Sequence, residues 1–149
     1  MLLAKFEDLP SLVGHDLGHS DYTEITQPQV NMFAVATNDH QWIHVDEERA
    51  AAGPFGGTIA HGFLTLSLIV PLWSELFDVA DVSSKLNYGL DRVRFTSPVR
   101  VGARVRLHSV IAAVEEVKGS TQITSANTLE IEGQERPAAV ADFIARFYA

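Results

Sequence analysis

Residues 60–77 read AHGFLTLSLIVPLWSELF, and ten of these eighteen side chains are large and apolar. Because the apolar side chains follow no single face, the stretch predicts a helix that protein surrounds on nearly every side. Pro71 is expected to kink this helix or to end its first part. The most apolar run, from Phe63 to Val70, is too short to cross a bilayer. The stretch therefore predicts a helix at the centre of the core.

The chain after this helix has the alternating pattern of strands. Four strand-like segments follow at 86–95, 104–117, 120–132 and 138–148. Lys118-Gly119-Ser120 indicates a tight reversal between the two long segments. A single helix followed by an antiparallel meander predicts the α+β class, because strands and helices do not alternate. We expect a curved sheet wrapped around the buried helix.

Shorter elements are expected before the central helix. Residues 21–25 alternate and predict a short strand. Thr26 has the position of an N-cap for a helix that ends near Thr37, with Pro28 in the first turn. Residues 38–45 have no clear period and predict a loop.

The segment that joins this loop to the central helix is also expected to be short and irregular. Asp46 has the position of an N-cap for a second helix over 47–52. The glycines of 53–57 (GPFGG) then predict a turn.

Length and composition are typical of one globular domain that spans 1–149, with 46% hydrophobic and 20% charged residues. The absence of cysteine excludes disulfides, thiol nucleophiles, thiolate metal sites and iron–sulfur clusters. The first residues lack the basic start and long apolar stretch of a signal peptide. We therefore expect a soluble cytoplasmic protein that does not bind membranes.

The charge of the chain disfavours nucleic acid as a partner. The net charge is −8, whereas nucleic-acid binding needs a broad basic surface. Five arginines nevertheless fall within 15 residues, namely Arg92, Arg94, Arg100, Arg104 and Arg106. They either line the solvated faces of strands or receive a small polyanion.

Residues 38–62 contain the side chains best suited to chemistry. Asp39 and His44 lie five residues apart in the expected loop. A carboxylate and an imidazole that face one pocket can hold a water molecule, with one of them accepting its proton. The alternative is structural, with Asp39 capping the end of a helix and His44 satisfied within a turn.

A metal site is a second interpretation of the same region. His40 and His44 are four residues apart, and Asp39, Asp46 or Glu47 could complete the ligand set. That spacing favours a shared metal ion only on a helix, and a loop is expected here. We therefore expect no metal.

A third interpretation concerns His61 and Gly62, where the glycine-rich turn enters the central helix. The free N–H groups at the start of a helix can bind an anion or a developing oxyanion, and glycine lets a ligand approach the backbone closely. Alternatively, Gly62 only allows a strand to cross the helix at short distance.

Three segments together resemble a known family. They are FAVATNDHQWIHVD at 33–46 followed by Ala50, IAHGFL at 59–64, and FTSPVRVG at 95–102. Their sequence and order resemble the MaoC-like (R)-specific enoyl-CoA hydratases of the hydratase 2 type, and are most similar to the single-domain actinobacterial type. The resemblance covers most of the chain.

This resemblance implies a hot-dog fold and a homodimer that binds acyl-CoA near the subunit interface. It implies that Asp39 and His44 are the catalytic pair and that the Gly62 N–H is the oxyanion donor. The implied reaction adds water reversibly to trans-2-enoyl-CoA and gives (R)-3-hydroxyacyl-CoA. Coenzyme A is then part of the substrate, and no metal, flavin or nicotinamide cofactor is expected.

Further residues are expected to contact the substrate. They are Trp42, Phe55 and Leu64 along the acyl chain, His61 beside Gly62, and Arg92 or Arg94 at the phosphates of CoA. Many members of the family have Asn-Pro where this chain has Gln41-Trp42, so the wall next to the catalytic pair differs. This departure affects the expected acyl-chain preference more than the reaction.

Two other functions fit the same pattern. A thioesterase of the same fold would also use a carboxylate and a helix start, but its water would attack the carbonyl carbon. A non-catalytic acyl-CoA-binding protein, or the partner subunit of a dehydratase heterodimer, needs no reactive pair. The presence of both Asp39 and His44 favours an enzyme over this last interpretation.

Overall fold

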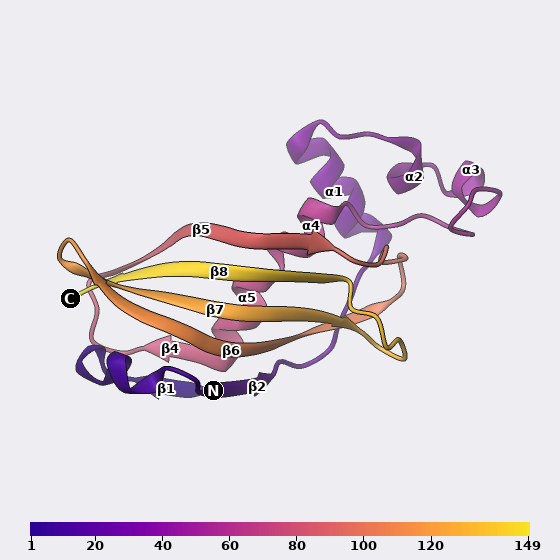
Figure 1. Cartoon of the computed structure of the whole chain (residues 1–149). Coiled ribbons are helices and arrows are strands. Elements are labelled where there is room, and N and C mark those ends of the chain that lie inside the picture. Colours follow the sequence, from indigo (N-terminus) through magenta and orange to yellow (C-terminus); the bar gives the residue numbers. More distant parts are fainter.

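A long antiparallel sheet, formed mainly by the second half of the chain, dominates the structure (Figure 1). This computed structural model describes residues 1–149. The strands of the sheet are β2 (Asp16–His19), β3 (Thr23–Glu24), β5 (Ser84–Phe95), β6 (Arg104–Val117), β7 (Ser120–Ile131) and β8 (Ala139–Tyr148). Their order is β2-β6-β7-β8-β5, and β3 pairs with β6 beside β2. The four predicted strands of the meander are confirmed, each to within two residues.

The predicted reversal after β6 is a two-residue hairpin. Val117 pairs with Ser120 across the turn. Lys118 and Gly119 between them have φ angles of 42° and 80°. Two successive positive φ angles are the conformation that matches the twist of paired strands, and glycine adopts it without steric cost.

The central helix consists of two pieces, α4 (Gly62–Ser67) and α5 (Ile69–Leu76), which are separated at Leu68. Pro71 is the third residue of α5. Proline has no N–H, so it is tolerated in the first turn, where no intrahelical acceptor would be used. The expectation that Pro71 kinks the helix or ends its first part is therefore confirmed. The break lies at Leu68, three residues before the proline.

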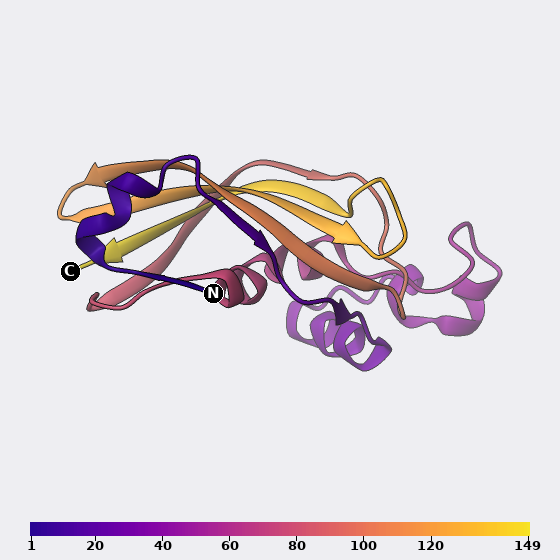
Figure 2. The same ribbon diagram turned by 90° about the horizontal axis from the view of Figure 1, so that it is seen from below.

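The core lies between α5 and the face of the sheet that curves around it (Figure 2). Leu107, Ile111, Ile123 and Leu129 of the sheet are fully buried in this cluster. The structure departs from the expectation that protein surrounds the helix on nearly every side, because Phe63 of α4 is 70% exposed. The sheet covers only one side of the helix, and its other side faces solvent in the single chain.

The N-terminal region adds elements that the sequence pattern did not reveal. Strand β1 (Leu2–Ala4) pairs in parallel with β4 (Phe77–Val79), which directly follows α5. The 3-10 helix η1 (Phe6–Leu12) connects β1 to β2. The expected strand at 21–25 is reduced to the two residues of β3. These segments are too short for a period to be detected.

Three helices project beyond one end of the sheet (Figure 1). They are α1 (Gln27–Thr37), α2 (Trp42–Val45) and α3 (Glu47–Ala51). The predicted caps are confirmed, because Thr26 Oγ1 accepts from the N–H of Gln29 at 3.4 Å and Asp46 Oδ1 accepts from that of Arg49 at 3.0 Å. Helix α2 lies where a loop was predicted. No helix in the structure has the length and apolar character needed to span a bilayer.

Candidate active site

Asp39 is brought to the site by the way in which α1 ends. Asn38 follows the helix in the left-handed conformation, with φ 59° and ψ 27°. Asparagine is one of the few residues that adopts this conformation readily, and it reverses the chain direction after a helix. Asn38 is therefore the helix cap, and Asp39 is the exposed first residue of the returning chain.

His44 lies on α2 and is held by a backbone carbonyl. Its Nδ1 is 2.7 Å from the carbonyl oxygen of Ile59, and the residue is only 6% exposed. Because a carbonyl only accepts, Nδ1 carries the proton and Nε2 of the neutral ring has a free lone pair. Gln27 adds a second restraint, since its Nε2 donates to the His44 carbonyl at 2.8 Å while its Oε1 accepts from Thr58 at 2.6 Å.

The surroundings of His44 favour its neutral form. Burial lowers the pKa of His44 below its ordinary value of 6.5, and the neighbouring His61 acts in the same direction. The hydrogen bond to Ile59 and the charge of Asp39 oppose this shift but do not cancel it. A neutral imidazole with a free Nε2 can accept a proton near neutral pH.

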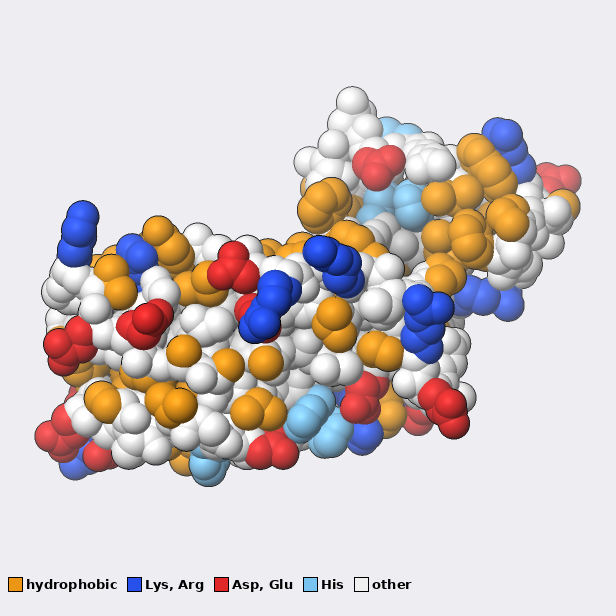
Figure 3. All heavy atoms as spheres, in the orientation of Figure 1, with side chains coloured by type: hydrophobic (Ala, Val, Ile, Leu, Met, Phe, Trp, Pro, Cys, Tyr) orange, Lys and Arg blue, Asp and Glu red, His pale blue; other side chains and the backbone are white.

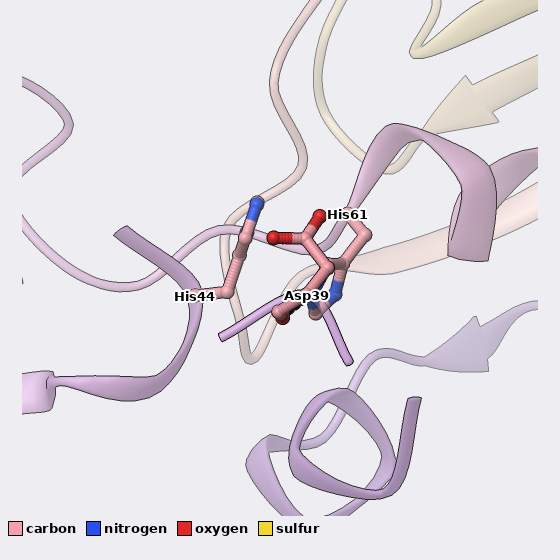
Figure 4. Close-up of side chains that lie close together, drawn as sticks. All are labelled: Asp39, His44 and His61. Carbon is pink, nitrogen blue, oxygen red and sulfur yellow. Dashed lines mark hydrogen bonds between the residues drawn. The ribbon is translucent and has the colours of Figure 1, made fainter. Parts of the chain in front are cut away.

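Asp39, His44 and His61 come together in space (Figure 4). One side-chain nitrogen or oxygen atom of each residue lies within 4.8 Å of those of the other two. The Asp39 carboxylate makes no direct hydrogen bond to His44; its Oδ1 accepts only from the N–H of Gln41 at 3.4 Å. Two polar atoms bridged by one water molecule are about 4.6 Å apart. The Asp39 and His44 side chains are therefore close enough for one water molecule to bridge them.

The same cluster is poorly arranged for a metal ion. The rings of His44 and His61 are stacked, with centroids 3.9 Å apart and planes inclined by 23°. Ring lone pairs lie in the ring planes, so two stacked imidazoles do not converge on one tetrahedral ion. His61 also uses Nε2 to donate to the Asp39 carbonyl at 3.0 Å. His40 is exposed and lies outside this cluster.

A cleft of about 380 Å³ opens beside His44. It is lined by His44, Phe55, Ile59, Ala60, Gly62, Thr65, Phe95, Thr96, Ser97, Pro98 and Val99. In the space-filling view, histidine and hydrophobic side chains gather on the projecting part, next to the hollow that separates it from the sheet (Figure 3). The cleft thus combines apolar walls with a polar group that can react.

Gly62 contributes its backbone to this cleft. It is the first residue of α4, and its N–H donates to no other protein group. A Cβ at Gly62 would lie 3.3 Å from three atoms of the Phe95 ring, so the ring would have to give by a few tenths of an ångström to accept a side chain. Glycine at this position therefore lets Phe95 pack closely and leaves the free N–H accessible.

Three of the other predicted contact residues lie elsewhere. Trp42 packs against Gly53 and carries the Arg49 guanidinium 4.3 Å from its ring centroid. Leu64 is buried in the hydrophobic core rather than in the wall of the cleft. His61 is buried behind His44 and does not line the cleft. Of the predicted apolar contacts, only Phe55 is brought to the cleft.

The two arginines expected at the phosphates of CoA are also not among the residues that line the cleft. Arg92 forms an ion pair with Asp142, and its Nε donates to the same carboxylate at 2.6 Å. Arg94 donates to the carbonyl of Val93 at 2.7 Å. Neither side chain lines the cleft.

Several residues that shape the site were not predicted. Phe95 forms a wall of the cleft, the Ile59 carbonyl orients His44, and Gln27 joins α2 to Thr58. Phe95 and Ile59 both belong to segments that the sequence singled out, but neither was assigned a role in the site. A backbone carbonyl and a glutamine on α1 carry no local signal, because their contacts depend on the tertiary structure.

Comparisons with known proteins agree with this architecture. Residues 8–133 match the family of the MaoC like domain. The 3-hydroxyacyl-thioester dehydratase Z of Mycobacterium tuberculosis is 52% identical over 143 residues, which cover 95% of each chain. These matches extend over nearly the whole chain and include both Asp39 and the start of α4.

Two solved structures show the same fold at lower identity. The (R)-hydratase from A. caviae aligns with a TM-score of 0.70 at 23% identity, over 89% of this chain and 94% of that chain. A chain of the HadBC 3R-hydroxyacyl-ACP dehydratase complex from M. tuberculosis aligns with a TM-score of 0.73 at 19% identity, over 91% of this chain and 96% of that chain. The chain therefore belongs to the MaoC-like dehydratase family of hydratase and dehydratase enzymes, and it has their hot-dog fold.

Proposed function

We propose that this protein is an (R)-specific enoyl-CoA hydratase that adds water reversibly to trans-2-enoyl-CoA. The observation that carries the proposal is the spacing of the Asp39 carboxylate and the His44 imidazole, which suits one shared water molecule beside a cleft. The name of the mycobacterial relative, a 3-hydroxyacyl-thioester dehydratase, supports the same reaction in its reverse direction.

The catalytic pair would activate the water. In a trans-2-enoyl thioester the carbonyl withdraws electrons from C3, so a partly deprotonated water can add there. The free Nε2 of His44 and the carboxylate of Asp39 hold the water, and the pair accepts one of its protons. The same pair returns a proton to C2, so that water is the only molecule consumed.

The Gly62 N–H would stabilise the charge that develops during the addition. As the C3–O bond forms, negative charge moves to the thioester oxygen and gives an enolate. Gly62 lies in the wall of the same cleft as His44, and its N–H has no protein acceptor. One such donor contributes roughly 3–4 kcal/mol to transition-state stabilisation. Because α4 is only six residues long, the argument rests on this N–H and not on a helix dipole.

The reaction needs no redox cofactor, because hydration of a double bond neither oxidises nor reduces the substrate as a whole. We propose that it also proceeds without a metal ion, since the thioester itself polarises C3 and Gly62 can receive the enolate charge. Activity that is unchanged after treatment with a strong chelator supports this part of the proposal, whereas loss of activity that added metal restores contradicts it.

We propose Arg100, ahead of Arg92 and Arg94, as the contact to the phosphates of CoA. Its Nη2 donates to the Gly56 carbonyl at 2.8 Å, in the turn next to the cleft-lining Phe55. Arg92, Arg104 and Arg106 are each paired with a carboxylate, whereas Arg94 and Arg100 are not. Arg94 donates to the carbonyl of its neighbour Val93, so only Arg100 of these two contacts the turn beside the cleft. An unpaired guanidinium beside the mouth of the cleft suits a phosphate.

We propose that the protein forms a homodimer through β5. This strand is a 12-residue edge of the sheet that is paired on one side only, and Leu86, Tyr88 and Leu90 are exposed along it. Long apolar edges of this kind are normally covered by another chain. One of the solved structures with the same fold is itself a complex, which is consistent with this assembly.

A direct assay separates the hydratase from a thioesterase. Purified protein is mixed with crotonyl-CoA, and the absorbance of the enoyl thioester and the release of free thiol are followed together. A hydratase removes the absorbance without releasing thiol, and the chirality of the 3-hydroxybutyryl product is then determined. Thiol release at the same rate as the loss of absorbance would establish a thioesterase.

The variant Asp39→Asn separates an enzyme from a non-catalytic binding protein. The amide cannot accept a proton from water, so turnover is expected to fall by orders of magnitude while acyl-CoA binding survives. Wild-type protein that binds crotonyl-CoA but does not turn it over would support the binding-protein alternative.

A further inference from the structure

His61 has an unusual position for a polar side chain. It is the residue directly before α4, and it is only 2% exposed. It lies next to Gly62 in sequence and beside Asp39 and His44 in space, as Figure 4 shows. It does not line the cleft, so direct contact with the substrate does not explain its burial.

The His61 ring makes one specific contact with each member of the proposed catalytic pair. Its Nε2 donates to the backbone carbonyl of Asp39 at 3.0 Å, which fixes the chain that carries the carboxylate. One face of the ring stacks on His44 with 3.9 Å between centroids, and Phe33 of α1 packs against the ring at 4.9 Å. The ring therefore restrains the backbone of one residue and the imidazole of the other.

The hydrogen bond also determines which ring nitrogen of His61 carries the proton. The Asp39 carbonyl only accepts, so Nε2 carries the proton. Nδ1 is buried and has no hydrogen-bond partner. An apolar ring of similar size would fill this space without leaving a polar atom unsatisfied. The packing alone does not call for histidine here, whereas the hydrogen bond to Asp39 does.

We propose that His61 is a positioning residue that sets the distance between the Asp39 carboxylate and the His44 imidazole and joins both to the start of α4. Because His61 immediately precedes Gly62, its backbone also sets the direction of the Gly62 N–H. One side chain thus fixes the position of the water-binding pair relative to the proposed oxyanion donor. This inference rests on the proposed hydratase function.

Two substitutions separate the hydrogen bond from the stacking. His61→Phe keeps an aromatic ring on His44 but removes the donor to Asp39, whereas His61→Gln keeps a donor near the position of Nε2 but removes the ring. For His61→Phe we expect kcat to fall about 10- to 100-fold, with KM changed by less than about threefold. His61→Gln should retain a larger part of kcat. The matched control is His40→Gln, at an exposed position one residue beyond Asp39, which should leave kcat and KM unchanged.

A double-mutant cycle with Asp39→Asn provides the decisive measurement. If His61 acts through Asp39, adding His61→Phe to Asp39→Asn should lower the residual kcat by less than about threefold, although it lowers wild-type kcat by at least about tenfold. A purely structural role would lower kcat by a similar factor in both backgrounds. Thermal unfolding shows which variants are folded, and His61→Met replaces His61→Phe in the cycle if the latter does not fold.

The outcomes keep this inference separate from the proposed function. Wild-type protein that does not hydrate crotonyl-CoA would overturn the function itself. Wild-type activity together with additive effects in the cycle, or a His61→Phe variant with normal kcat, would overturn the positioning role alone. A raised KM with normal kcat would assign His61 to substrate binding instead.

Discussion

His44 shows how a single buried side chain can be prepared for proton transfer by its surroundings. The Ile59 carbonyl fixes which nitrogen carries the proton, and burial lowers the pKa of the ring below 6.5. The sequence pointed to His44 through its spacing from Asp39, but neither of these effects could be deduced from spacing. Both effects arise because α2 packs against Ile59, which lies 15 residues from His44 in the sequence.

The lowered pKa of His44 predicts a specific dependence of stability on pH. Below about 6.5 the unfolded chain takes up a proton that folded His44 resists, so the free energy of unfolding falls as the pH falls toward the lowered pKa. Above pH 7 the ring is neutral in both states and contributes no pH dependence. Denaturant unfolding of wild type and His44→Gln between pH 5 and 8 measures this contribution. The difference in free energy between the two proteins should shrink on the acid side only, and a constant difference would contradict the assignment.

Gly62 allows the contribution of one N–H to be measured almost in isolation. Proline is accepted at the first position of a helix, and the preceding residue, His61, has ψ 139°, which is compatible with a following proline. Gly62→Pro removes the N–H, while Gly62→Ala keeps it, and both place a Cβ against Phe95. We expect kcat of the proline variant to lie about 100- to 1000-fold below that of the alanine variant. Equal kcat values would show that this N–H does not stabilise the transition state.

At the level of helices and strands, the sequence predicted the structure most accurately where a local rule applied. Thr26 and Asp46 were recognised as caps because a side-chain oxygen before a helix has a defined partner in the first turn. The long strands were recognised by their alternation. Helix α2 was missed, because a single turn over Trp42–Val45 is too short to show a period.

The break in the central helix shows the limit of the same local rules. Pro71 predicted a kink or an end, but not that the break would fall at Leu68. Pro71 has no N–H for the carbonyl of Ser67, the last residue of α4, and the break separates α4, which reaches toward the projecting helices, from α5, which lies on the sheet (Figures 1 and 2). The exposure of Phe63 was also beyond prediction, because a hydropathy pattern does not show which side of a helix a sheet leaves open.

The edge strand β5 gives a prediction about assembly. Leu90→Asp places a charge on this edge, where Leu90 is exposed in the single chain. If two copies pair through β5, burying this charge is costly, and the dimer should dissociate more readily. Sedimentation velocity over a range of protein concentrations measures the change. Leu3→Asp, at an exposed position on β1, is the control that should remain a dimer. A wild-type monomer, or an unchanged Leu90→Asp dimer, would contradict pairing through β5.

For the molecule as a whole, the positions of the charged side chains were the feature that the sequence predicted least well. The sequence grouped five arginines within 15 residues of a chain with a net charge of −8. The fold distributes them differently, because Arg104 pairs with Glu132 and Arg106 with Glu130 across neighbouring strands, while Arg92 pairs with Asp142. These partners lie far away in the sequence. The candidate pair Asp39 and His44 could be recognised because the two residues are close in sequence. Arg100 could be singled out only once the fold showed that three of the other arginines pair with carboxylates and that Arg94 bonds to the neighbouring Val93 carbonyl.

A charge reversal at Arg100 tests whether this residue contacts the phosphates of the CoA that carries the acyl group. Arg100→Glu should raise KM for crotonyl-CoA about tenfold or more with little change in kcat, because a carboxylate repels the phosphates but does not reach the reacting atoms. The same variant should leave kcat/KM unchanged for the crotonyl thioester of N-acetylcysteamine, which has no phosphate. Arg94→Glu is the control for a general effect of charge, since Arg94 bonds to the Val93 carbonyl of its own strand, whereas Arg100 bonds to the Gly56 carbonyl in the turn beside the cleft. Because long-range attraction is screened by salt whereas a direct contact is screened much less, the difference between the two variants should persist at high ionic strength. Equal effects of the two variants on crotonyl-CoA, or an equal loss with both thioesters, would exclude Arg100 as the phosphate contact.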